Sequence, residues 1–326
     1  MGRIVITDGM SEKAVSILLN AGHSVQQEHY SEDQILQGAL LDYDAVVIRS
    51  ATKLLKKEIE ASSSVNGGIG FIGRAGVGVD NIDIDTATNH GIYVCNTPTA
   101  STRSVVELTM GHLIASSRHI PSADKSLKKG LWEKKKFRGT ELGGKNLGLI
   151  GFGRIARGVA NIAIAFGMEV HIFDPFISET PDGIVVHDNI EELFSSCTHI
   201  SIHCNLSEET ENLVSLNLIS LMPGIGADGV ECGNHIVSCA RGGIVKENDA
   251  LEALDSGRLS SLALDVFENE PLGDSPLLSR IGFHGTPHIA ASTMEAQSRV
   301  GSEMARLLLE FFDSGKPGVS LNGMHI

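Results

Sequence analysis

The chain has 326 residues, of which 42% are hydrophobic and 20% are charged, and its 26 Lys and Arg against 40 Asp and Glu give a net charge of −14. This length predicts about two globular domains and excludes a small stapled scaffold, while the composition excludes a disordered chain. Nucleic acid and anionic membrane surfaces reward clustered cations, so the acidic balance argues against both as main partners.

The five cysteines form no Cys-x-x-Cys pair, which argues against a disulfide framework and favours a reducing compartment. The chain opens on no signal-peptide pattern and has no run of about eighteen apolar residues, so we expect a soluble, cytoplasmic protein. The 13 histidines show no metal-ligand spacing. We expect no bound metal.

The first hundred residues alternate short apolar runs with helical patterns. Strands are predicted at 4–7, 45–49 and 70–72, and helices at 12–20 and 32–39. Alternation of this kind is typical of a parallel sheet covered by helices. Pro98 marks the end of this first domain, because the residue before a proline disfavours helix.

A long helix is predicted over 101–118, ending before Pro121, and we interpret it as a connector between domains. Seven Lys and Arg residues then lie between 125 and 138 against one acid, Glu133. A solvated surface and a functional patch are both open interpretations of this basic stretch.

A second αβ series follows, with strands predicted at 147–150, 170–173, 184–186, 200–203, 236–239 and 262–266. The last helix is predicted over 293–312, opened by a capping box in which Ser292 and Glu295 satisfy each other's backbone amides. Its length indicates a return to the first domain, and we expect no third, effector-binding domain after it. The fold class is therefore α/β with two parallel-sheet domains, the first of them discontinuous.

A glycine-rich turn follows the first strand of the second series. Gly151 and Gly153, with Ala156 three residues on, form G-x-G-x-x-A between an apolar strand and a helical pattern. The first glycine permits the tight turn, the second lets a pyrophosphate approach the backbone, and the alanine keeps helix and strand close. About twenty residues on, Asp174 ends the next strand, where a carboxylate accepts both ribose hydroxyls of an adenosine.

This combination predicts dinucleotide binding, against the alternative of a glycine-rich turn in a nucleotide-free α/β fold. The carboxylate of Asp174 repels a 2′-phosphate, and Pro175 and Phe176 follow it rather than Arg or Lys. We therefore expect NAD rather than NADP as the cofactor.

Three later segments end a predicted strand with a polar residue, namely Arg241, Glu270 and His288. Ligands of open α/β sheets bind at the carboxyl ends of the strands, so these three side chains are expected to converge on one cleft. They would supply a carboxylate anchor, an acid that favours a protonated histidine, and a general base. Each of them alone is more often turn chemistry than catalysis.

With these residues in place, the chain resembles the D-isomer-specific 2-hydroxyacid dehydrogenase family almost from end to end. The resemblance lies in the Gly151 turn, in Asp-Val-Phe from Asp265, in the Arg241, Glu270-Pro271 and Pro287-His288 segments, and in three earlier stretches at 49–53, 73–83 and 96–98. It implies two Rossmann-like domains: residues 1–98 with 291–326 as a flavodoxin-like substrate-binding domain, and 99–290 as the NAD-binding domain.

The resemblance also implies roles for single residues. Arg241 would bind the substrate carboxylate, His288 would exchange the hydroxyl proton, and Glu270 would hold and charge the histidine. Asp265 would fix the nicotinamide carboxamide. The implied cofactor contacts are Val77, Gly151, Gly153, Arg154, Ile155, Asp174, His203, Cys204, Cys239, Ala240, Asp265 and Ala291.

Within the family, the chain resembles the branch that oxidises 3-phospho-D-glycerate with NAD at the entry to L-serine synthesis. The implied substrate contacts are Arg49, Ser50, Arg74, Gly76, Val77, Gly78 and Lys134. Arg49 and Arg74 hold the family's phosphate-facing positions. Lys134 resembles a residue that reaches the neighbouring subunit's substrate, which would require a homodimer or homotetramer, although a plain surface lysine remains open.

Two other functions stay open. A glyoxylate or hydroxypyruvate reductase of the same family would not need Arg49 and Arg74 together, and an NAD-sensing co-repressor would use the same fold. Two departures from the family pattern stand out. Asn205 replaces a usual proline in the loop near the adenine, which leaves that loop less restrained. Residues 223–234 form an extra segment before a strand, expected to be exposed, tolerant of change and remote from the site.

Overall fold

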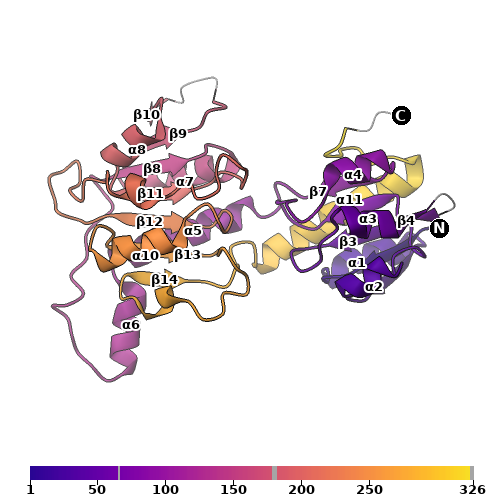
Figure 1. Cartoon of the computed structure of the whole chain (residues 1–326), viewed down its shortest axis with the longest axis horizontal. Coiled ribbons are helices and arrows are strands. Elements are labelled where there is room, and N and C mark those ends of the chain that lie inside the picture. Colours follow the sequence, from indigo (N-terminus) through magenta and orange to yellow (C-terminus); the bar gives the residue numbers. More distant parts are fainter. Residues whose placement is uncertain (65–66, 178–181, 324–326) are drawn as a thin grey trace. The chain divides into compact units, whose positions relative to one another are not determined.

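The computed structural model describes residues 1–64, 67–177 and 182–323, and the chain forms two compact units (Figure 1). Unit 1 comprises Met1–Ser101 and Ala291–Ile326, whereas unit 2 comprises Thr102–Ala290. The backbone therefore passes from unit 1 to unit 2 once and back once, and unit 1 is discontinuous in sequence.

Unit 1 is built on a sheet of five parallel strands in the order β2-β1-β3-β6-β7. Their bounds are β1 (Arg3–Ile6), β2 (Ser24–Gln27), β3 (Ala45–Ile48), β6 (Phe71–Arg74) and β7 (Tyr93–Asn96). A short antiparallel ribbon of β4 (Ser63–Ser64) and β5 (Gly67–Gly68) lies outside it. The central strands are buried on both faces, as expected for a sheet covered by helices on two sides.

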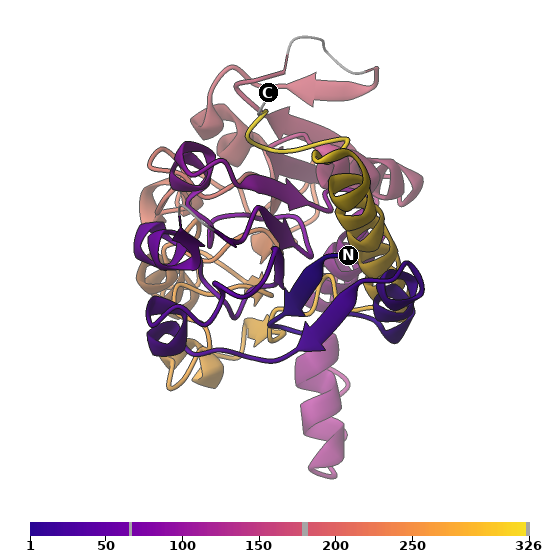
Figure 2. The same cartoon turned by 90° about the vertical axis from the view of Figure 1, so that its right-hand side faces the viewer.

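Helices cover both faces of this sheet. On one face, α1 (Glu12–Asn20) packs beside α11 (Met294–Ser314), which Figure 2 shows as neighbouring helices. On the other lie α2 (Glu32–Leu36), α3 (Lys56–Ser62) and α4 (Ile84–Asn89). From α11, Val300, Met304, Leu307 and Leu308 enter the first core layer with Ile4 and Val47. Each such side chain contributes about 1.5–3 kcal/mol by leaving water.

Unit 2 is built on a sheet of seven parallel strands in the order β10-β9-β8-β11-β12-β13-β14. Their bounds are β8 (Asn146–Ile150), β9 (Glu169–Phe173), β10 (Ile184–Val186), β11 (His199–Ile202), β12 (His235–Ser238), β13 (Ser261–Leu264) and β14 (Phe283–Gly285). The strand order reverses between β8 and β11. Because all strands are parallel, their carboxyl ends form one edge and their amino ends the other.

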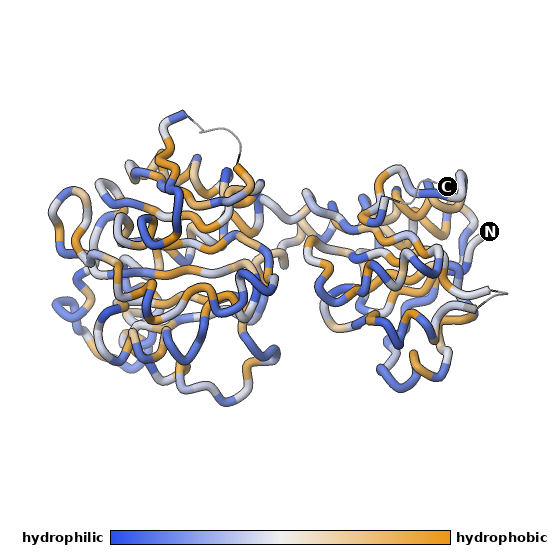
Figure 3. Tube along the Cα trace, turned by 45° about the horizontal axis from the view of Figure 1, so that its top comes forward, coloured by the Kyte–Doolittle hydropathy of each residue, from blue (hydrophilic) through white to orange (hydrophobic). Residues whose placement is uncertain are grey.

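Two helical layers sandwich this second sheet. One contains α5 (Thr102–Ser117) and α7 (Arg154–Ala165), and the other contains α8 (Ile190–Ser196), α9 (Leu216–Ile219) and α10 (Glu247–Asp255). The short helix η1 (Pro276–Ser279) precedes β14, and α6 (Ile120–Lys128) lies beyond the β14 side of the sheet in Figure 1. In both units, apolar positions gather along the central strands and polar positions along the surrounding loops (Figure 3).

The predicted α/β fold with two parallel-sheet domains is confirmed, but the sequence analysis missed three edge strands and misplaced one cap. β2, β7 and β14 were not predicted: β2 is polar, β14 has only three residues, and β7 lies just before Pro98, where only a domain end was predicted. The last helix is capped by Thr293, whose side chain accepts from the amide of Ala296. The predicted capping box of Ser292 and Glu295 is therefore wrong by one residue.

Residues 1–64, 67–177 and 182–323 lack two features that would indicate a membrane or a metal site. None of their helices is long and apolar enough to cross a membrane. The same residues hold no group of three or more His, Cys, Asp or Glu side chains placed to bind a metal ion.

Candidate active site

Asp265 organises the carboxyl edge of unit 2. It follows β13 and is fully buried, and its backbone amide donates to Ser238 of β12. Its Oδ1 accepts from Thr286 Oγ1 at 2.5 Å and from the Ile289 amide at 2.8 Å, and its Oδ2 accepts from the Ala290 amide at 2.8 Å. One buried carboxylate thus holds the loop that follows β14, and its charge is balanced by hydrogen bonds rather than by a cation.

His288 lies in that same loop with a backbone φ of 53°, a left-handed conformation uncommon for a residue with a side chain. Its amide donates to the carbonyls of Asp265 and Thr286, which hold it in this conformation. Such conformations cost about 1–3 kcal/mol and persist only where the surroundings enforce them. In this conformation the His288 side chain is 36% exposed, so a ligand can reach it.

Glu270 contacts His288 directly. Its Oε2 lies 2.7 Å from His288 Nδ1, and its Oε1 accepts from the amide of Phe267 at 3.0 Å. Burial raises the pKa of Glu270, but the hydrogen bonds from His288 and from Phe267, together with the charges of His288 and Arg241, outweigh burial and leave the pKa below its ordinary value. The carboxylate therefore stays ionised and can support a protonated imidazole.

Arg241 lies in the loop after β12, with Nη1 donating to the Ala240 carbonyl at 2.7 Å. The next residue has to be glycine, because a Cβ on Gly242 would lie 1.8 Å from the carbonyl oxygen of Phe267. This close approach brings the Arg241 loop against the segment that carries Glu270. The structure therefore brings Arg241, Glu270 and His288, predicted from three separate segments, to one edge of the sheet.

The glycine turn has the geometry that the sequence predicts. Gly151 has a φ of 83°, and a Cβ there would meet the amide nitrogen of Cys204 at 3.0 Å. Gly153 is the N-cap of α7 and supplies no side-chain cap, while a Cβ on it would meet no atom within 4 Å. Without a side-chain cap, the first amides of α7, beginning at Arg154 and Ile155, are available to an anion at the helix N-terminus.

Asp174 follows β9 beside this turn. Its Oδ2 accepts from the Phe152 amide at 2.7 Å, and its Oδ1 accepts from the Phe176 amide at 2.9 Å. Each carboxylate oxygen has a second lone pair, so the side chain can still accept hydroxyl donors. The residues present therefore fit an adenosine dinucleotide.

Three further predicted cofactor contacts carry no charge. Burial raises the pKa of Cys204 to about 11 and that of Cys239 to about 12, so both are protonated thiols at neutral pH. Burial lowers the pKa of His203 to about 4, and its Nε2 lies 3.0 Å from Ser201 Oγ. These residues can shape the edge of the site but do not supply nucleophiles or proton carriers.

The loop after β11 carries Asn205 where proline was expected. The Thr210 hydroxyl donates to the Asn205 carbonyl at 2.6 Å and accepts from the Ser207 amide at 2.8 Å. These two bonds restrain the loop in the absence of proline. The expected loss of restraint relative to a proline stays a prediction.

In unit 1, the predicted substrate residues lie in the loops after β3 and β6. Arg74 Nη2 donates to Ser50 Oγ at 3.1 Å. A Cβ on Gly76 would lie 1.5 Å from Arg74 Nη1, so a side chain there would displace the Arg74 guanidinium. Val77 and Gly78 follow in the same loop, which is tied to β7 by the Asn96 side chain donating to the Val77 carbonyl.

The loop at 49–52 is held by two residues that the sequence analysis missed. Asp8 Oδ2 accepts from the amides of Arg49 and Thr52 at 2.7 and 3.0 Å, and its Oδ1 accepts from the Thr52 hydroxyl at 2.7 Å. From the other side, Asn81 Nδ2 donates to the carbonyls of Arg49 and Thr52, both at 2.7 Å. The position of Asp8 directly after β1 was the available signal, since polar residues at strand ends favour sites.

Two other predicted residues, Lys134 and Ala291, lie in other segments of the chain. Lys134 is exposed in the segment after α6, and the described residues of this chain offer it no ion-pair partner. Ala291 is the first residue of unit 1 after the return from unit 2, and its carbonyl accepts from the Gln297 side chain at 3.4 Å.

The extra segment at 223–234 supplies the partner of a buried lysine. It lies at the amino edge of the sheet, where Asp228 Oδ2 is 2.6 Å from Nζ of Lys145, a side chain only 2% exposed. Asn234 is buried and bonds the Gly224 amide and the Arg258 carbonyl. Because Asp228 pairs with a buried lysine, loss of its carboxylate is expected to be unfavourable, and the predicted tolerance of this segment to change stays a prediction.

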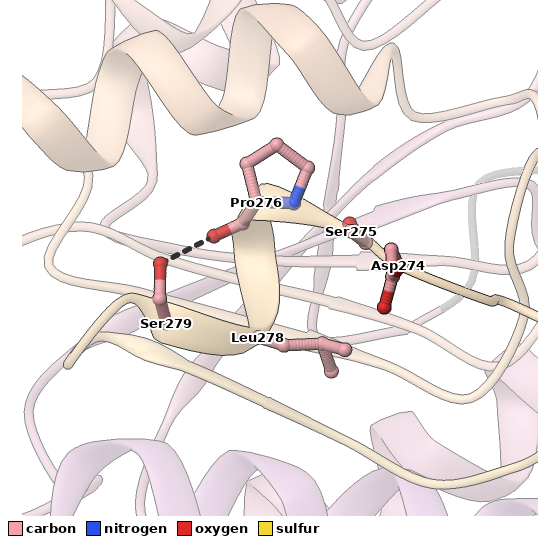
Figure 4. A pocket seen from close by; sticks show the side chains of 5 residues that line it. All are labelled: Asp274, Ser275, Pro276, Leu278 and Ser279. Carbon is pink, nitrogen blue, oxygen red and sulfur yellow. Dashed lines mark hydrogen bonds between the residues drawn. The ribbon is translucent and has the colours of Figure 1, made fainter.

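A shallow hollow of about 480 Å³ opens at η1, lined by Asp274, Ser275, Pro276, Leu278 and Ser279 (Figure 4). Ser279 Oγ donates to the Pro276 carbonyl at 2.8 Å and closes the short helix. The one ionisable group in this lining, Asp274, is an anion. The hollow therefore does not suit an anionic substrate.

A parallel sheet with a glycine turn, a carboxylate at the end of the following strand and a His–Glu pair at its carboxyl edge is the arrangement that nicotinamide-dependent dehydrogenases use. Residues 110–290 match the family model described as "D-isomer specific 2-hydroxyacid dehydrogenase, NAD binding domain". The chain belongs to the D-isomer specific 2-hydroxyacid dehydrogenase family, which confirms the resemblance seen in the sequence.

Individual relatives point in two directions. The chain is 42% identical to a D-3-phosphoglycerate dehydrogenase of Methanocaldococcus jannaschii over 308 residues, covering 94% of this chain and 56% of that protein. It is equally 42% identical to a hydroxypyruvate reductase of Thermotoga maritima over 312 residues, covering 94% and 97%. The chain thus spans little more than half of the first relative and nearly all of the second.

Among solved structures, the TT0316 protein from Thermus thermophilus superposes with a TM-score of 0.87 at 26% identity, covering 98% of this chain and 99% of that one. This likeness extends over both units and agrees with the family assignment.

Proposed function

We propose that the chain oxidises 3-phospho-D-glycerate to 3-phosphohydroxypyruvate with NAD, as a step toward L-serine in a reducing, cytoplasmic compartment. The observation that carries this proposal is the cation cluster of unit 1. Arg74 Nη2 donates to Ser50 Oγ, and Arg49 precedes Ser50 in a loop where Asp8 accepts from the Arg49 amide and Asn81 donates to its carbonyl. Guanidinium groups bind phosphate oxygens in a bidentate way, so two arginines carried on these loops suit a phosphorylated substrate. The Methanocaldococcus relative supports the same activity.

The residues of unit 2 supply the acid–base chemistry. Because Nδ1 of His288 is engaged by Glu270, Nε2 is the nitrogen that takes the proton from the C2 hydroxyl. Glu270 stabilises the imidazolium that forms, and Arg241 orients the substrate carboxylate. NAD, when bound, accepts the hydride that leaves C2. In the reverse direction the protonated His288 returns its proton to the keto oxygen, so the same pair serves oxidation and reduction.

The choice of NAD over NADP rests on Asp174. Its carboxylate accepts two backbone amides, and no cation follows it directly, since Pro175 and Phe176 are next. A 2′-phosphate in its place would meet an anion with no compensating charge. The open amides at the start of α7 receive the pyrophosphate.

A second candidate is reduction of hydroxypyruvate or glyoxylate. The Thermotoga relative favours it, because that protein matches this chain over nearly its whole length. Such a substrate carries no phosphate and does not need two fixed arginines. The two candidates therefore differ in what the cation cluster of unit 1 contributes.

Arg49→Ala tests the proposal, with Lys57→Ala on α3 as a control that removes an exposed cation from the same unit. We expect Arg49→Ala to lower kcat/KM for 3-phosphoglycerate by about 10–100-fold, the value of a charge-assisted hydrogen bond, and to leave D-glycerate oxidation little changed. Initial rates of NADH formation measure both. Equal losses for the two substrates would refute a phosphate-binding role, and NADH binding without turnover of any hydroxy acid would favour a sensing protein.

We further propose that the chain forms a homodimer or homotetramer through α6 and the segment after it. Ile120, Leu127, Leu131 and Trp132 are all exposed there, the last of them 85%. Contiguous exposed apolar side chains of this kind mark interaction surfaces. Lys134, two residues on, would then reach the substrate of the partner. Sedimentation of Trp132→Glu, which places a charge in the contact, is expected to shift the mass toward the monomer.

A further inference from the structure

Two neighbouring histidines, His112 and His284, have no part in the chemistry described above. His112 comes from α5, which packs across β12 and β13, and His284 comes from β14. Their ring centroids are 5.2 Å apart, and His112 is 4% exposed. Within the described part of the chain, His284 Nε2 is buried without a hydrogen-bond partner, whereas His112 Nε2 lies 3.2 Å from Thr286 Oγ1.

The Thr286 hydroxyl settles how this contact is arranged. It has one proton and two polar neighbours, Asp265 Oδ1 at 2.5 Å and His112 Nε2 at 3.2 Å. A carboxylate only accepts, so the hydroxyl proton points to Asp265 and the His112 Nε2–H donates to Thr286 Oγ1. His112 is then the neutral tautomer with its proton on Nε2, a form that burial favours by lowering the pKa of this side chain.

We propose that His112 is a positioning residue for the nicotinamide: its Nε2–H holds the Thr286 hydroxyl in the rotamer that fixes the Asp265 carboxylate for the carboxamide NH₂. The inference rests on the proposed function, together with the role that the family resemblance implies for Asp265 as acceptor of that hydrogen bond. His112 does not touch the cofactor. It acts through Thr286 alone, from helix α5, which packs on β12 and β13.

The arrangement of donors explains why this rotamer matters. Thr286 and the Ile289 amide occupy Oδ1 of Asp265, and the Ala290 amide binds Oδ2, so three donors set the plane of the carboxylate. Without the His112 donor, the Thr286 hydroxyl is free to rotate away and one of the three is lost. Hydrogen bonds in series polarise one another, so the terminal donor strengthens the whole row.

The test compares binding of NAD with binding of its 3-acetylpyridine analogue, in which an acetyl group replaces the carboxamide and offers no N–H donor. ADP-ribose reports the rest of the cofactor site. His112→Leu removes the donor, and His112→Gln keeps one. His235→Gln is the matched control, because it alters another buried histidine of unit 2 at the opposite edge of the sheet.

We expect His112→Leu to weaken NAD binding about tenfold, the value of one hydrogen bond, and to leave the analogue and ADP-ribose unchanged. His112→Gln restores NAD binding, and Thr286→Val shows the same selective loss, which does not grow when His112→Leu is added. If His112→Leu fails to fold, the Gln and Val variants carry the comparison.

Three other results are informative: two would overturn the role of His112, and one would overturn the role of Asp265. Equal losses for NAD, analogue and ADP-ribose in His112→Leu would show a role in packing alone, and unchanged NAD binding would remove any role; either result sinks the inference. If the unmodified protein binds NAD and its acetylpyridine analogue equally well, the proposed role of Asp265 fails instead, whatever the variants do.

Discussion

The two edges of the seven-stranded sheet in unit 2 both carry histidines, and the two sets differ in every physical respect. At the carboxyl edge, the side chains of His288 and Glu270 are each about a third exposed, and His288 Nδ1 lies 2.7 Å from Glu270 Oε2. At the amino edge, His199 and His235 are buried and stacked with ring centroids 4.5 Å apart. The first pair can exchange a proton with a ligand, whereas the second is shielded from one.

Hydrogen bonds account for the inertness of the amino-edge pair. Serine and threonine hydroxyls lie within 3.2 Å of both ring nitrogens of His199, and His235 contacts Ser261 and the Cys232 carbonyl. With every ring nitrogen engaged and no carboxylate in contact, burial lowers the pKa of both rings. Histidine is therefore reactive here because of exposure and a carboxylate partner, and not because of its chemistry alone.

The largest effect is expected for His288→Ala. It removes the proton acceptor at the carboxyl edge, so kcat should fall on the order of 10³-fold, whereas NADH binding should persist because Asp174 and the α7 amides are untouched. Steady-state rates and NADH fluorescence titration measure the two quantities. Undiminished turnover would show that the exposed pair is not the acid–base group.

Glu270→Gln keeps the shape of the partner but removes its charge. The imidazolium of His288 then loses its stabilisation, and we expect kcat to fall about 10²-fold. Glu268→Gln, a neighbouring carboxylate that bonds the Glu247 amide, is the matched control and should leave kcat unchanged. Similar losses in both variants would attribute the effect to the loop rather than to the pair.

The pKa of Glu270 also gives a pH dependence. It lies below its ordinary value of 4.5, so the pair contributes stability that is complete above that value and is lost only as the pH falls through the lower folded pKa. Glu270 therefore should not produce a fall in activity between pH 5 and 7, and a kcat profile of the unmodified protein checks this.

At the amino edge, Asp228→Asn should lower stability and leave catalysis intact. It removes the partner of the buried Lys145, and an uncompensated buried cation is strongly unfavourable. Urea unfolding should show a lower midpoint than for Glu231→Gln, an exposed acid of the same extra segment. Equal midpoints would mean that the segment is as tolerant as the sequence indicated.

The smallest effect is a change in slope. The pKa of His235 is lowered from 6.5 to about 4, so between these values the unfolded chain takes up a proton that the folded chain does not. The free energy of unfolding is unaffected above pH 6.5 and falls as the pH drops, by up to about 1.4 kcal/mol per pH unit for each such histidine. His235→Gln should flatten this decline in urea titrations, and an unchanged slope would contradict the lowered pKa.

Sequence alone reached the fold and the residues that end strands. The strands of the central sheet are apolar runs, and Asp174 and Arg241 each follow a predicted strand, so the apolar pattern and these positions predicted both residues, whereas His288 follows β14, which was not predicted. Sequence analysis did not identify residues whose hydrogen-bond partners lie far along the chain. Asp8 bonds a loop 41 residues on, and His112 contacts Thr286 174 residues on.

Such supporting residues carry no local signal, because their hydrogen bonds exist only once the sheet order is known. A histidine within an amphipathic helix looks the same in sequence whether it packs or donates. The same is true of the extra segment at 223–234, whose composition reads as an exposed turn although Asp228 neutralises a buried lysine.

The discontinuity of unit 1 has a consequence for the order in which the protein folds during synthesis. Strands β1, β3, β6 and β7 leave the ribosome early, but the helix that covers one of their faces, α11, begins only at Met294. All of unit 2 emerges in between and can complete its own core first. The part of the first sheet that α11 covers therefore stays exposed while nearly two hundred residues are made. During this interval a holdase chaperone could bind the exposed apolar side chains.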